Sequence, residues 1–323
     1  MNKRRKIIFA LSASLLAPWA HAQDATKTLR IGWLAPGTAA SQTAILDVLR
    51  KGLRDIGYVE GKNLVIETRW GDGSFDRVPQ LAKELAALKV VAIVTAFTAT
   101  AIAAKQAVTD VPIIFTLVGD PAALVQNLAH PGGNVTGITG NNVLLAPKRL
   151  EILREVLPGV TRVAFIYRGD ALVDRSKLDE TMKAARKLGA KITPVDTQQI
   201  SYTEAFKRAA TAHAKAAIVV QNTYSFDARR EITGLAAKHR IAAMYEMPVF
   251  VADGGLISYS VSLYAQVGRV AAYVEKIFKG AKAGDLPVEQ SATLELAINL
   301  KVAKALGIKL PKVITMRADT VIE

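Results

Sequence analysis

The chain has 323 residues, of which 50% are hydrophobic and 22% charged, and this is the balance of a folded soluble protein with one large or two ordinary domains. It contains no cysteine, which excludes disulfides, thiol nucleophiles and cysteine-ligated metals. The formal net charge of +14 raises the question of a nucleic-acid partner. Because the Lys and Arg residues are scattered along the chain, we predict solvated basic faces, some contribution to docking on a membrane partner, and no nucleic-acid binding.

The N-terminus has the three parts of a secretory signal peptide. Residues 2–6 are a basic segment, residues 7–17 are an apolar segment, and residues 20–22 form an Ala-His-Ala cleavage site. The apolar run is too short for a membrane anchor, and no cysteine follows it that could carry a lipid. We therefore predict a periplasmic protein whose signal peptide, residues 1–22, is cleaved after Ala22.

Strand and helix patterns alternate along the first 140 residues. Apolar runs and apolar–polar alternation predict strands at 29–34, 63–69, 90–95, 113–115 and 135–139. Apolar residues at helical spacing predict helices at about 42–56, 76–88 and 101–108, with a short helix after Pro121. Together these patterns predict a doubly wound α/β lobe.

The alternation returns after residue 140 and predicts a second α/β lobe. Its expected strands are 162–167, 191–195, 216–220 and 241–244, and its expected helices are 147–157, 172–188, 203–213 and one that ends at residue 239. The tail departs from this plan. It predicts a strand at 256–261, a long helix at 263–279, an extended segment at 288–290 and a last helix at 296–306.

Several motifs resemble a family of bacterial ABC-transporter substrate-binding proteins that includes tryptophan- and tyrosine-binding members. They are the Val-Gly-Asp-Pro run at 118–121, His-Pro-Gly-Gly-Asn-Val-Thr-Gly-Ile-Thr at 130–139, and Leu-Pro-Val-Glu-Gln at 286–290. The resemblance continues through residues 57–63, 299–307 and 317–323. It covers essentially all of the chain that follows the signal peptide.

The resemblance implies the type I periplasmic-binding-protein fold, which is two doubly wound parallel-sheet α/β lobes joined by a three-stranded hinge. We expect lobe 1 to comprise 28–140 plus 256–288, and lobe 2 to comprise 141–255 plus 289–323. The crossings between lobes are then expected near 139–142, 254–256 and 288–290. The resemblance also implies a small-molecule ligand, an ABC permease in the inner membrane as partner, and a monomer.

Three loops of the first lobe follow strand ends and lead into helices. Free N–H groups at a helix N-terminus can hold a carboxylate, and nearby hydroxyl groups add donors. The candidates for ligand binding are Thr38, Ser41, Thr98 and Thr100, with Thr139 at the expected first crossing. Capping of the helices by the same hydroxyl groups is the alternative.

Asp120 is the candidate partner for a substrate ammonium group. It lies between Gly119 and Pro121 at the end of a predicted strand, where ligands collect in open parallel sheets. The alternative is that Asp120 caps a helix that begins with Pro121. Phe97 is bulky where a small residue would leave more room, and it touches the same expected cleft.

The second lobe offers Asn222, Tyr224 and Tyr245 on its rim and Tyr259 near the hinge. A tyrosine combines apolar area with a polar tip, which suits an amino acid or an aromatic ligand, although each could equally be packed in the core. The predicted mechanism is closure of the lobes around a ligand that bridges them. A periplasmic ligand sensor is the alternative function, and an exported α/β enzyme is a third.

The sequence gives no positive indication of catalysis. It lacks the Gly-x-Ser-x-Gly, Ser-x-x-Lys, His-Glu-x-x-His and Walker patterns, and His130, His213 and His239 are far apart. We therefore predict that the protein is not an enzyme and has no catalytic residues, no metal site and no cofactor.

Overall fold

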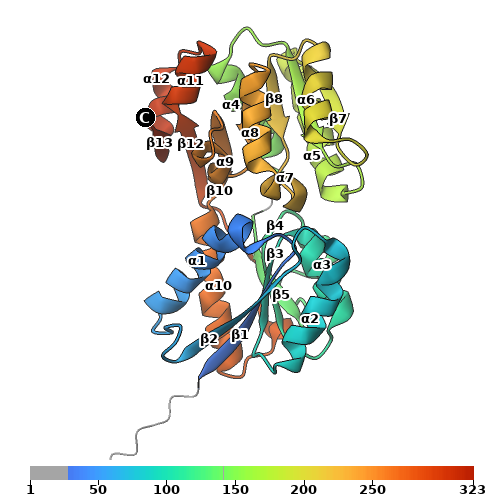
Figure 1. Ribbon diagram of the computed structural model, residues 1–323, viewed down its shortest axis with the longest axis vertical. Coiled ribbons are helices and arrows are strands. Elements are labelled where there is room, and N and C mark those ends of the chain that lie inside the picture. Colours follow the sequence, from blue (N-terminus) through green and yellow to red (C-terminus); the bar gives the residue numbers. More distant parts are fainter. Residues whose placement is uncertain (1–27, 141) are drawn as a thin grey trace, which may run out of the picture.

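The computed structural model describes residues 28–140 and 142–323 and consists of two α/β lobes, one above the other in Figure 1. The predicted signal peptide lies outside the described residues. None of the helices in the described part of the chain combines the length and apolarity that crossing a bilayer requires. The two-lobed α/β architecture expected from the sequence is confirmed.

Lobe 1 is built on a six-stranded parallel sheet with the order β11-β5-β4-β3-β1-β2. Its strands are β1 (Leu29–Ala35), β2 (Leu64–Trp70), β3 (Ile93–Ala96), β4 (Ile113–Val118), β5 (Val135–Thr139) and β11 (Glu289–Gln290). Helices α1 (Ala39–Asp55) and α10 (Leu263–Phe278) pack together, as do α2 (Val78–Ala87) and α3 (Thr98–Ala107). Every residue of β3, β4 and β5 is buried, since helices cover both faces of these strands.

Lobe 2 is built on a seven-stranded sheet with the order β13-β12-β10-β9-β8-β6-β7. Its strands are β6 (Arg162–Tyr167), β7 (Lys191–Asp196), β8 (Ala216–Val219), β9 (Ala242–Tyr245), β10 (Ile257–Val261), β12 (Leu294–Asn299) and β13 (Thr320–Ile322). Its helices are α4 (Ala146–Val156), α5 (Leu172–Leu188), α6 (Tyr202–Thr211), α7 (Thr223–Asp227), α8 (Arg229–Lys238), α9 (Pro248–Ala252), α11 (Leu300–Leu306) and α12 (Lys312–Arg317). All neighbouring strands described here run parallel except β10 and β12.

The sheet order corrects the expected boundaries of the lobes. The strand expected in lobe 1 at 256–261 is β10, which pairs with β9 and β12 in lobe 2. Only its helix α10 belongs to lobe 1, so the chain crosses between residues 261 and 263 rather than at 254–256 (Figure 1). Similarly, β11 pairs with β5 in lobe 1, so the third crossing lies between residues 290 and 294. A strand and the helix after it usually share a lobe, and here they do not.

The tail also differs from the expected helix at 296–306. Residues 294–299 form strand β12, and the helix begins only at Leu300. Asn299 ends the strand and caps the helix, because its side-chain oxygen accepts a hydrogen bond from the Val302 backbone N–H at 3.0 Å. The short helix expected after Pro121 is a single 3₁₀ turn, Pro121–Ala123.

The β4–β5 pair depends on a glycine. Gly137 lies opposite Phe115, and a Cβ atom at Gly137 would lie 2.2 Å from the Phe115 carbonyl oxygen. We expect Gly137→Ala to lower the free energy of unfolding by at least about 2 kcal/mol, because backbone must move to admit the methyl group. Urea unfolding measures this change.

Gly159→Ala is the matched control, since a Cβ atom at this loop position meets nothing within 4 Å. It should change stability by no more than about 0.5 kcal/mol. Equal destabilisation by the two substitutions would show that the close contact between Gly137 and Phe115 does not determine the cost of the Gly137 substitution.

Candidate functional site

A cavity of about 650 Å³ lies between the lobes, within the usual size range of small-molecule sites. It is placed where the carboxyl ends of β3 and β4 face those of β6 and β8, as expected for ligand sites in open α/β sheets. Lobe 1 contributes Phe75, Phe97, Thr98, Ala99, Ile102, Leu117, Gly119, Asp120, Ala122 and Ala123. Lobe 2 and the first crossing contribute Asn142, Arg168, Asp170, Ala171, Leu172, Val173, Asp174, Lys177, Gln221, Asn222, Thr223 and Tyr224.

Aromatic rings join the lobes at this cavity. Phe75 of lobe 1 and Tyr224 of lobe 2 both line it, and their ring centroids are 5.1 Å apart. The Arg168 guanidinium carbon lies 4.0 Å from the Tyr224 ring centroid, in the range of a cation–π contact. A second ring contact joins Phe97 to Phe226 at 5.5 Å. One side of the cavity is therefore an aromatic wall that exists only when the lobes are together.

Two bulky residues of the cavity wall have strained backbone. Phe97 has φ +72° and Leu117 has φ +56°, a region that side chains larger than glycine seldom occupy. Leu117 lies where the pairing of β4 with β5 is irregular, between Phe115 and Val118. Such strain costs roughly 1–3 kcal/mol per residue and gathers at binding sites. Of the six non-glycine residues with positive φ in the described part of the chain, these two line the interlobe cavity, while Asp72, Lys89, His213 and Arg240 lie in turns elsewhere.

The N-terminus of α3 also faces the cavity, since Thr98 and Ala99 line it. The first backbone N–H groups of a helix have no partner within the helix. The N-cap residue is Phe97, whose side chain cannot accept a hydrogen bond from them. This helix end therefore offers uncapped N–H groups and a partial positive charge to an anionic part of a ligand.

Behind the lobe 2 wall lies a buried network centred on the Glu246 carboxylate. Glu246 accepts from Arg149 Nη1 at 2.7 Å, from Lys177 Nζ at 2.6 Å, and from the Gln221 backbone N–H at 3.0 Å. All three charged side chains are at most 2% exposed. Burial alone would raise the pKa of Glu246, but the Arg149 and Lys177 cations outweigh it and hold that pKa below its usual value.

The same arginine reaches two of the crossings between lobes. Arg149 Nε donates to the Tyr259 carbonyl oxygen at 2.8 Å, and Nη1 donates to the Asn142 carbonyl oxygen at 3.2 Å. Asn142 lies just after β5 and lines the cavity, while Tyr259 belongs to β10, which leads into the second crossing. The network thus connects the hinge with Lys177 and Gln221 of the cavity wall.

Asp174 is the cavity residue with an unused acceptor. Its Oδ2 accepts from the Arg168 backbone N–H and from Asn222 Nδ2, both at 3.1 Å. Its Oδ1 is buried and has no hydrogen-bond partner. Burial raises the pKa of Asp174 to about 6, against the opposing effect of Lys177. Buried acceptors are seldom left unpaired, so Oδ1 is suited to a donor or cation supplied by a ligand.

Four of the ligand-binding residues predicted from the sequence line this cavity: Thr98, Asp120, Asn222 and Tyr224. Asp120 is exposed, and its Oδ1 also accepts from the Ala122 backbone N–H at 2.9 Å, so it serves as the N-cap of the 3₁₀ turn as well. Asn222 caps α7, and its amide donates to Asp174. Capping and cavity lining therefore occur together at these positions.

Two further candidates, Thr38 and Ser41, lie outside the cavity and have capping roles instead. Thr38 Oγ1 accepts from the Ser41 backbone N–H at 3.2 Å, and Ser41 Oγ donates to the Thr38 carbonyl oxygen at 3.0 Å. Both sit beside a direct contact between the lobes, where Gln42 Nε2 lies 3.5 Å from Asp227 Oδ1.

The remaining candidates belong to the interior, which corrects their expected placement. Thr100 and Thr139 are fully buried, and Thr139 Oγ1 donates to the Val118 carbonyl oxygen at 2.7 Å. Tyr245 is fully buried and stacks on Phe250 at 5.0 Å. Tyr259 packs against the lobe 2 core. Core packing, the alternative for these tyrosines, accounts for both.

Sequence reasoning missed the charged residues of the cavity wall, above all Arg168, Asp174 and Lys177. The sequence does contain an indication of these residues, because Arg168 directly follows strand β6 just as Asp120 follows the region of strand β4. Asp174 and Lys177 lie three residues apart in the first turns of α5 and therefore share a helix face. Within residues 28–140 and 142–323, no group of three or more His, Asp or Glu side chains is placed to hold a metal ion.

Comparisons with known proteins identify relatives along most of the chain. The family described as ABC transporter substrate binding protein matches residues 36–322. A tyrosine-binding protein of Clostridioides difficile is 25% identical over 271 residues, which is 82% of this chain and 78% of the relative.

Two solved structures share the fold. One is an ABC domain from Streptococcus pneumonia in complex with L-Trp, with a TM-score of 0.83, 24% identity, and coverage of 92% of this chain and 100% of the other. The second is the ligand-free, open structure of a substrate-binding protein from Clostridium difficile, with a TM-score of 0.67, 22% identity, and coverage of 91% and 99%.

The raised pKa of Asp174 predicts how the stability of the unliganded protein depends on pH. Its folded-state pKa of about 6 lies above the ordinary 3.8, so its stabilising contribution is full below pH 3.8 and is lost as pH rises through 6. We expect the free energy of unfolding to fall by about 1.5 kcal/mol between pH 5 and pH 8 through this group. Asp174→Asn should lack this loss in urea unfolding.

The comparison isolates Asp174, because Lys177 and Glu246, the charged side chains that face it, are present in both proteins. Asp179→Asn, an exposed position on the same helix, is the control and should keep the wild-type pH dependence. An identical pH dependence in Asp174→Asn and wild type would contradict the assignment.

Proposed function

The chain belongs to the ABC transporter substrate-binding protein family, and we propose that its interlobe cavity captures an amino acid with an aromatic side chain for delivery to the permease of an ABC importer. Proteins of this family bind small ligands and work with an ABC permease. The observation that carries the choice of ligand is the buried, unpartnered Oδ1 of Asp174 in the cavity wall.

The ammonium group of the ligand binds Asp174 from lobe 2 and Asp120 from lobe 1. The cavity's other charged side chains are already engaged, since Lys177 pairs with Glu246 and Arg168 pairs with Asp170. The two free carboxylate positions lie on adjoining segments: a Cβ atom at Gly119 would lie 3.3 Å from Val173 Cγ2. A cation between them bonds to both lobes at once.

The carboxylate group of the ligand binds the uncapped N-terminus of α3. Its first N–H groups and the Thr98 hydroxyl group donate hydrogen bonds there. A zwitterion then satisfies two complementary features of the cavity: an anion-binding helix end in lobe 1 and a carboxylate acceptor in lobe 2. A neutral sugar would leave the Asp174 carboxylate without a cation.

The side chain of the ligand packs against Phe75, Phe97 and Tyr224. These rings supply a flat apolar surface, and aromatic pairs add roughly 0.5–1.5 kcal/mol beyond area burial. The relatives support this choice, since one is named a tyrosine-binding protein and another structure holds L-Trp.

Transport follows from closure of the lobes around the ligand. Contacts of α7 with lobe 1, through Tyr224 and Phe226, are made only while the lobes are together. The higher TM-score with the L-Trp complex than with the ligand-free, open structure supports a closed arrangement here. A ligand that contacts both lobes shifts the equilibrium toward this form, which then docks on the permease.

The proposal includes export to the periplasm with removal of residues 1–22, action as a monomer, and no nucleic-acid partner or enzymatic activity. The basic and apolar segments before Ala22 support export. The family and its structural neighbours are binding proteins, which supports capture without turnover.

Calorimetric titration with L-tryptophan and L-tyrosine tests the ammonium site. We expect Asp174→Asn to weaken binding about 100-fold, because a charge-assisted hydrogen bond in a buried site is lost. Asp120→Asn should weaken binding about 10-fold, a smaller loss because this carboxylate is exposed.

Asp179→Asn again serves as the control and should bind with wild-type affinity. Wild-type affinity in Asp174→Asn would exclude its carboxylate as the ammonium partner, and wild-type affinity in Asp120→Asn would remove lobe 1 from that role. Thermal unfolding of each variant shows whether it is folded.

A further inference from the structure

The positive charge of the protein is concentrated in one lobe. Lobe 2, residues 142–261 and 294–323, has 23 Lys and Arg residues against 15 Asp and Glu residues. Lobe 1, residues 28–140 and 263–290, has 14 against 12. Along the sequence, the Lys and Arg residues recur at intervals and form no single cluster. The fold gathers them.

Within lobe 2, cations collect at the amino ends of the parallel strands. The turns that lead into β6, β7, β8 and β9 are 157–162, 187–191, 211–215 and 238–241, and none contains Asp or Glu. We call their exposed Lys and Arg residues the basic edge: Arg162, Lys187, Lys191, Lys215, Lys238 and Arg240. The turns into β2, β3 and β4 of lobe 1, residues 56–63, 88–92 and 108–112, in contrast hold two lysines against two acidic residues.

The sheet register brings the turns of the basic edge side by side. Arg162 and Lys191 are direct partners on β6 and β7, and the Ala242 backbone N–H of β9 donates to the Lys215 carbonyl oxygen at 3.0 Å. Like charges directly opposite each other are destabilising in a sheet. No member of the basic edge has an ion-pair partner in the described part of the chain, and Glu155, in the last turn of α4, is paired with Arg317. Such a row suits an external anionic partner.

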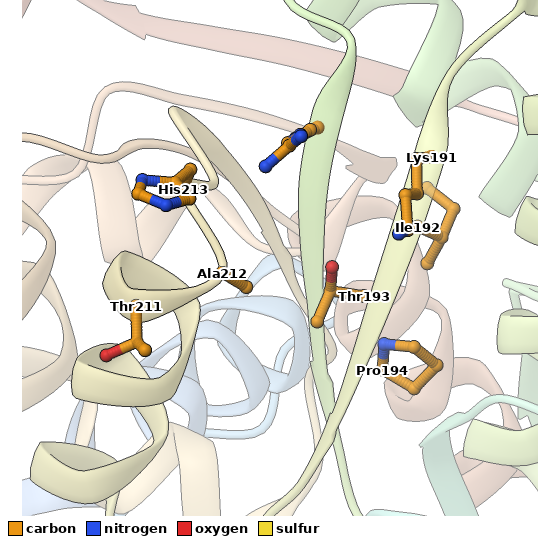
Figure 2. A pocket seen from close by; sticks show the side chains of 8 residues that line it. Lys191, Ile192, Thr193, Pro194, Thr211, Ala212 and His213 are labelled. Carbon is orange, nitrogen blue, oxygen red and sulfur yellow. The ribbon is translucent and has the colours of Figure 1, made fainter.

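A second cavity, of about 490 Å³, opens in the basic edge. Figure 2 shows Lys191, Thr193 and Pro194 of β7 on one side and Thr211, Ala212 and His213 at the C-terminal end of α6 on the other. Arg162 also lines it, and no carboxylate does. Cationic side chains with neighbouring hydroxyl groups are the donors that phosphate oxygens accept from.

We propose that the basic edge docks the protein on a membrane surface rich in anionic phospholipid, with one headgroup phosphate in the cavity of Figure 2. A row of cations across four strands fits a charged surface, whereas a single free anion would use the cavity alone. The ligand cavity lies at the opposite, carboxyl ends of β6 and β8, so docking leaves it open. Membrane attachment of this kind concentrates the binding protein near membrane-embedded partners.

The test is sedimentation of the chain from residue 23 with vesicles of phosphatidylcholine alone or with 30% phosphatidylglycerol. Each basic residue near an anionic surface contributes roughly fivefold to partitioning. We therefore expect binding only to the anionic vesicles, loss of binding at high salt, and partitioning about 100-fold weaker for the combined variant Arg162→Glu, Lys191→Glu, Lys215→Glu.

A matched control reverses three exposed positive charges of lobe 1, Arg54→Glu, Lys62→Glu and Lys83→Glu, and changes the net charge equally. It should retain binding within about threefold, since its charges lie far from the membrane surface compared with the Debye length. Equal loss in both variants would overturn the proposal, because net charge alone would then explain binding. Displacement by 10 mM inorganic phosphate at constant ionic strength would overturn it too, in favour of a free-phosphate site.

Discussion

The structure depends on the buried carboxylate of Glu246. It holds Arg149 and Lys177 in a desolvated network, and Arg149 in turn binds the backbone of Asn142 and Tyr259 beside two crossings between lobes. Removing one member of a buried ion pair is far more destabilising than the pair is stabilising, because a charge is left unpaired. The network therefore fixes the position of the hinge segments relative to lobe 2. Through Lys177 it also fixes the position of the cavity wall.

The cavity is assembled from groups that are unfavourable for the folded state. Phe97 and Leu117 have strained backbone, the first N–H groups of α3 lack a side-chain cap, and Asp174 keeps a buried oxygen without a partner. A protein selected only for stability would lack these features, and a zwitterionic ligand compensates the last two together. Strained backbone and buried polar atoms without hydrogen-bond partners, found together, indicate a binding site. In this protein they lie where the two lobes meet.

Much of the fold follows from sequence pattern, whereas the site follows only in part. The period of apolar residues predicted both lobes, whereas the expected lobe boundaries placed β10 with α10 in lobe 1, because no local signal shows that a strand and the helix after it belong to different lobes. A hydroxyl or carboxylate at a helix start has the same local signature whether it caps or binds, so Thr38 and Thr98 could not be distinguished in advance. The sequence indicates that Asp174 and Lys177 share a helix face, but only the tertiary structure shows that this face borders the cavity and that the turns of the basic edge lie together.

The central claim, that a zwitterionic amino acid bridges the lobes, is tested most directly with ligands that lack one charge. Calorimetric titration would compare L-tryptophan with tryptamine, which lacks the carboxylate, and with indole-3-propionate, which lacks the ammonium group. The account predicts one-to-one binding of the amino acid and at least about 100-fold weaker binding of both analogues. Binding of either analogue as tightly as the amino acid would contradict it, because the Asp174 carboxylate or the α3 N-terminus would then have no role in recognition.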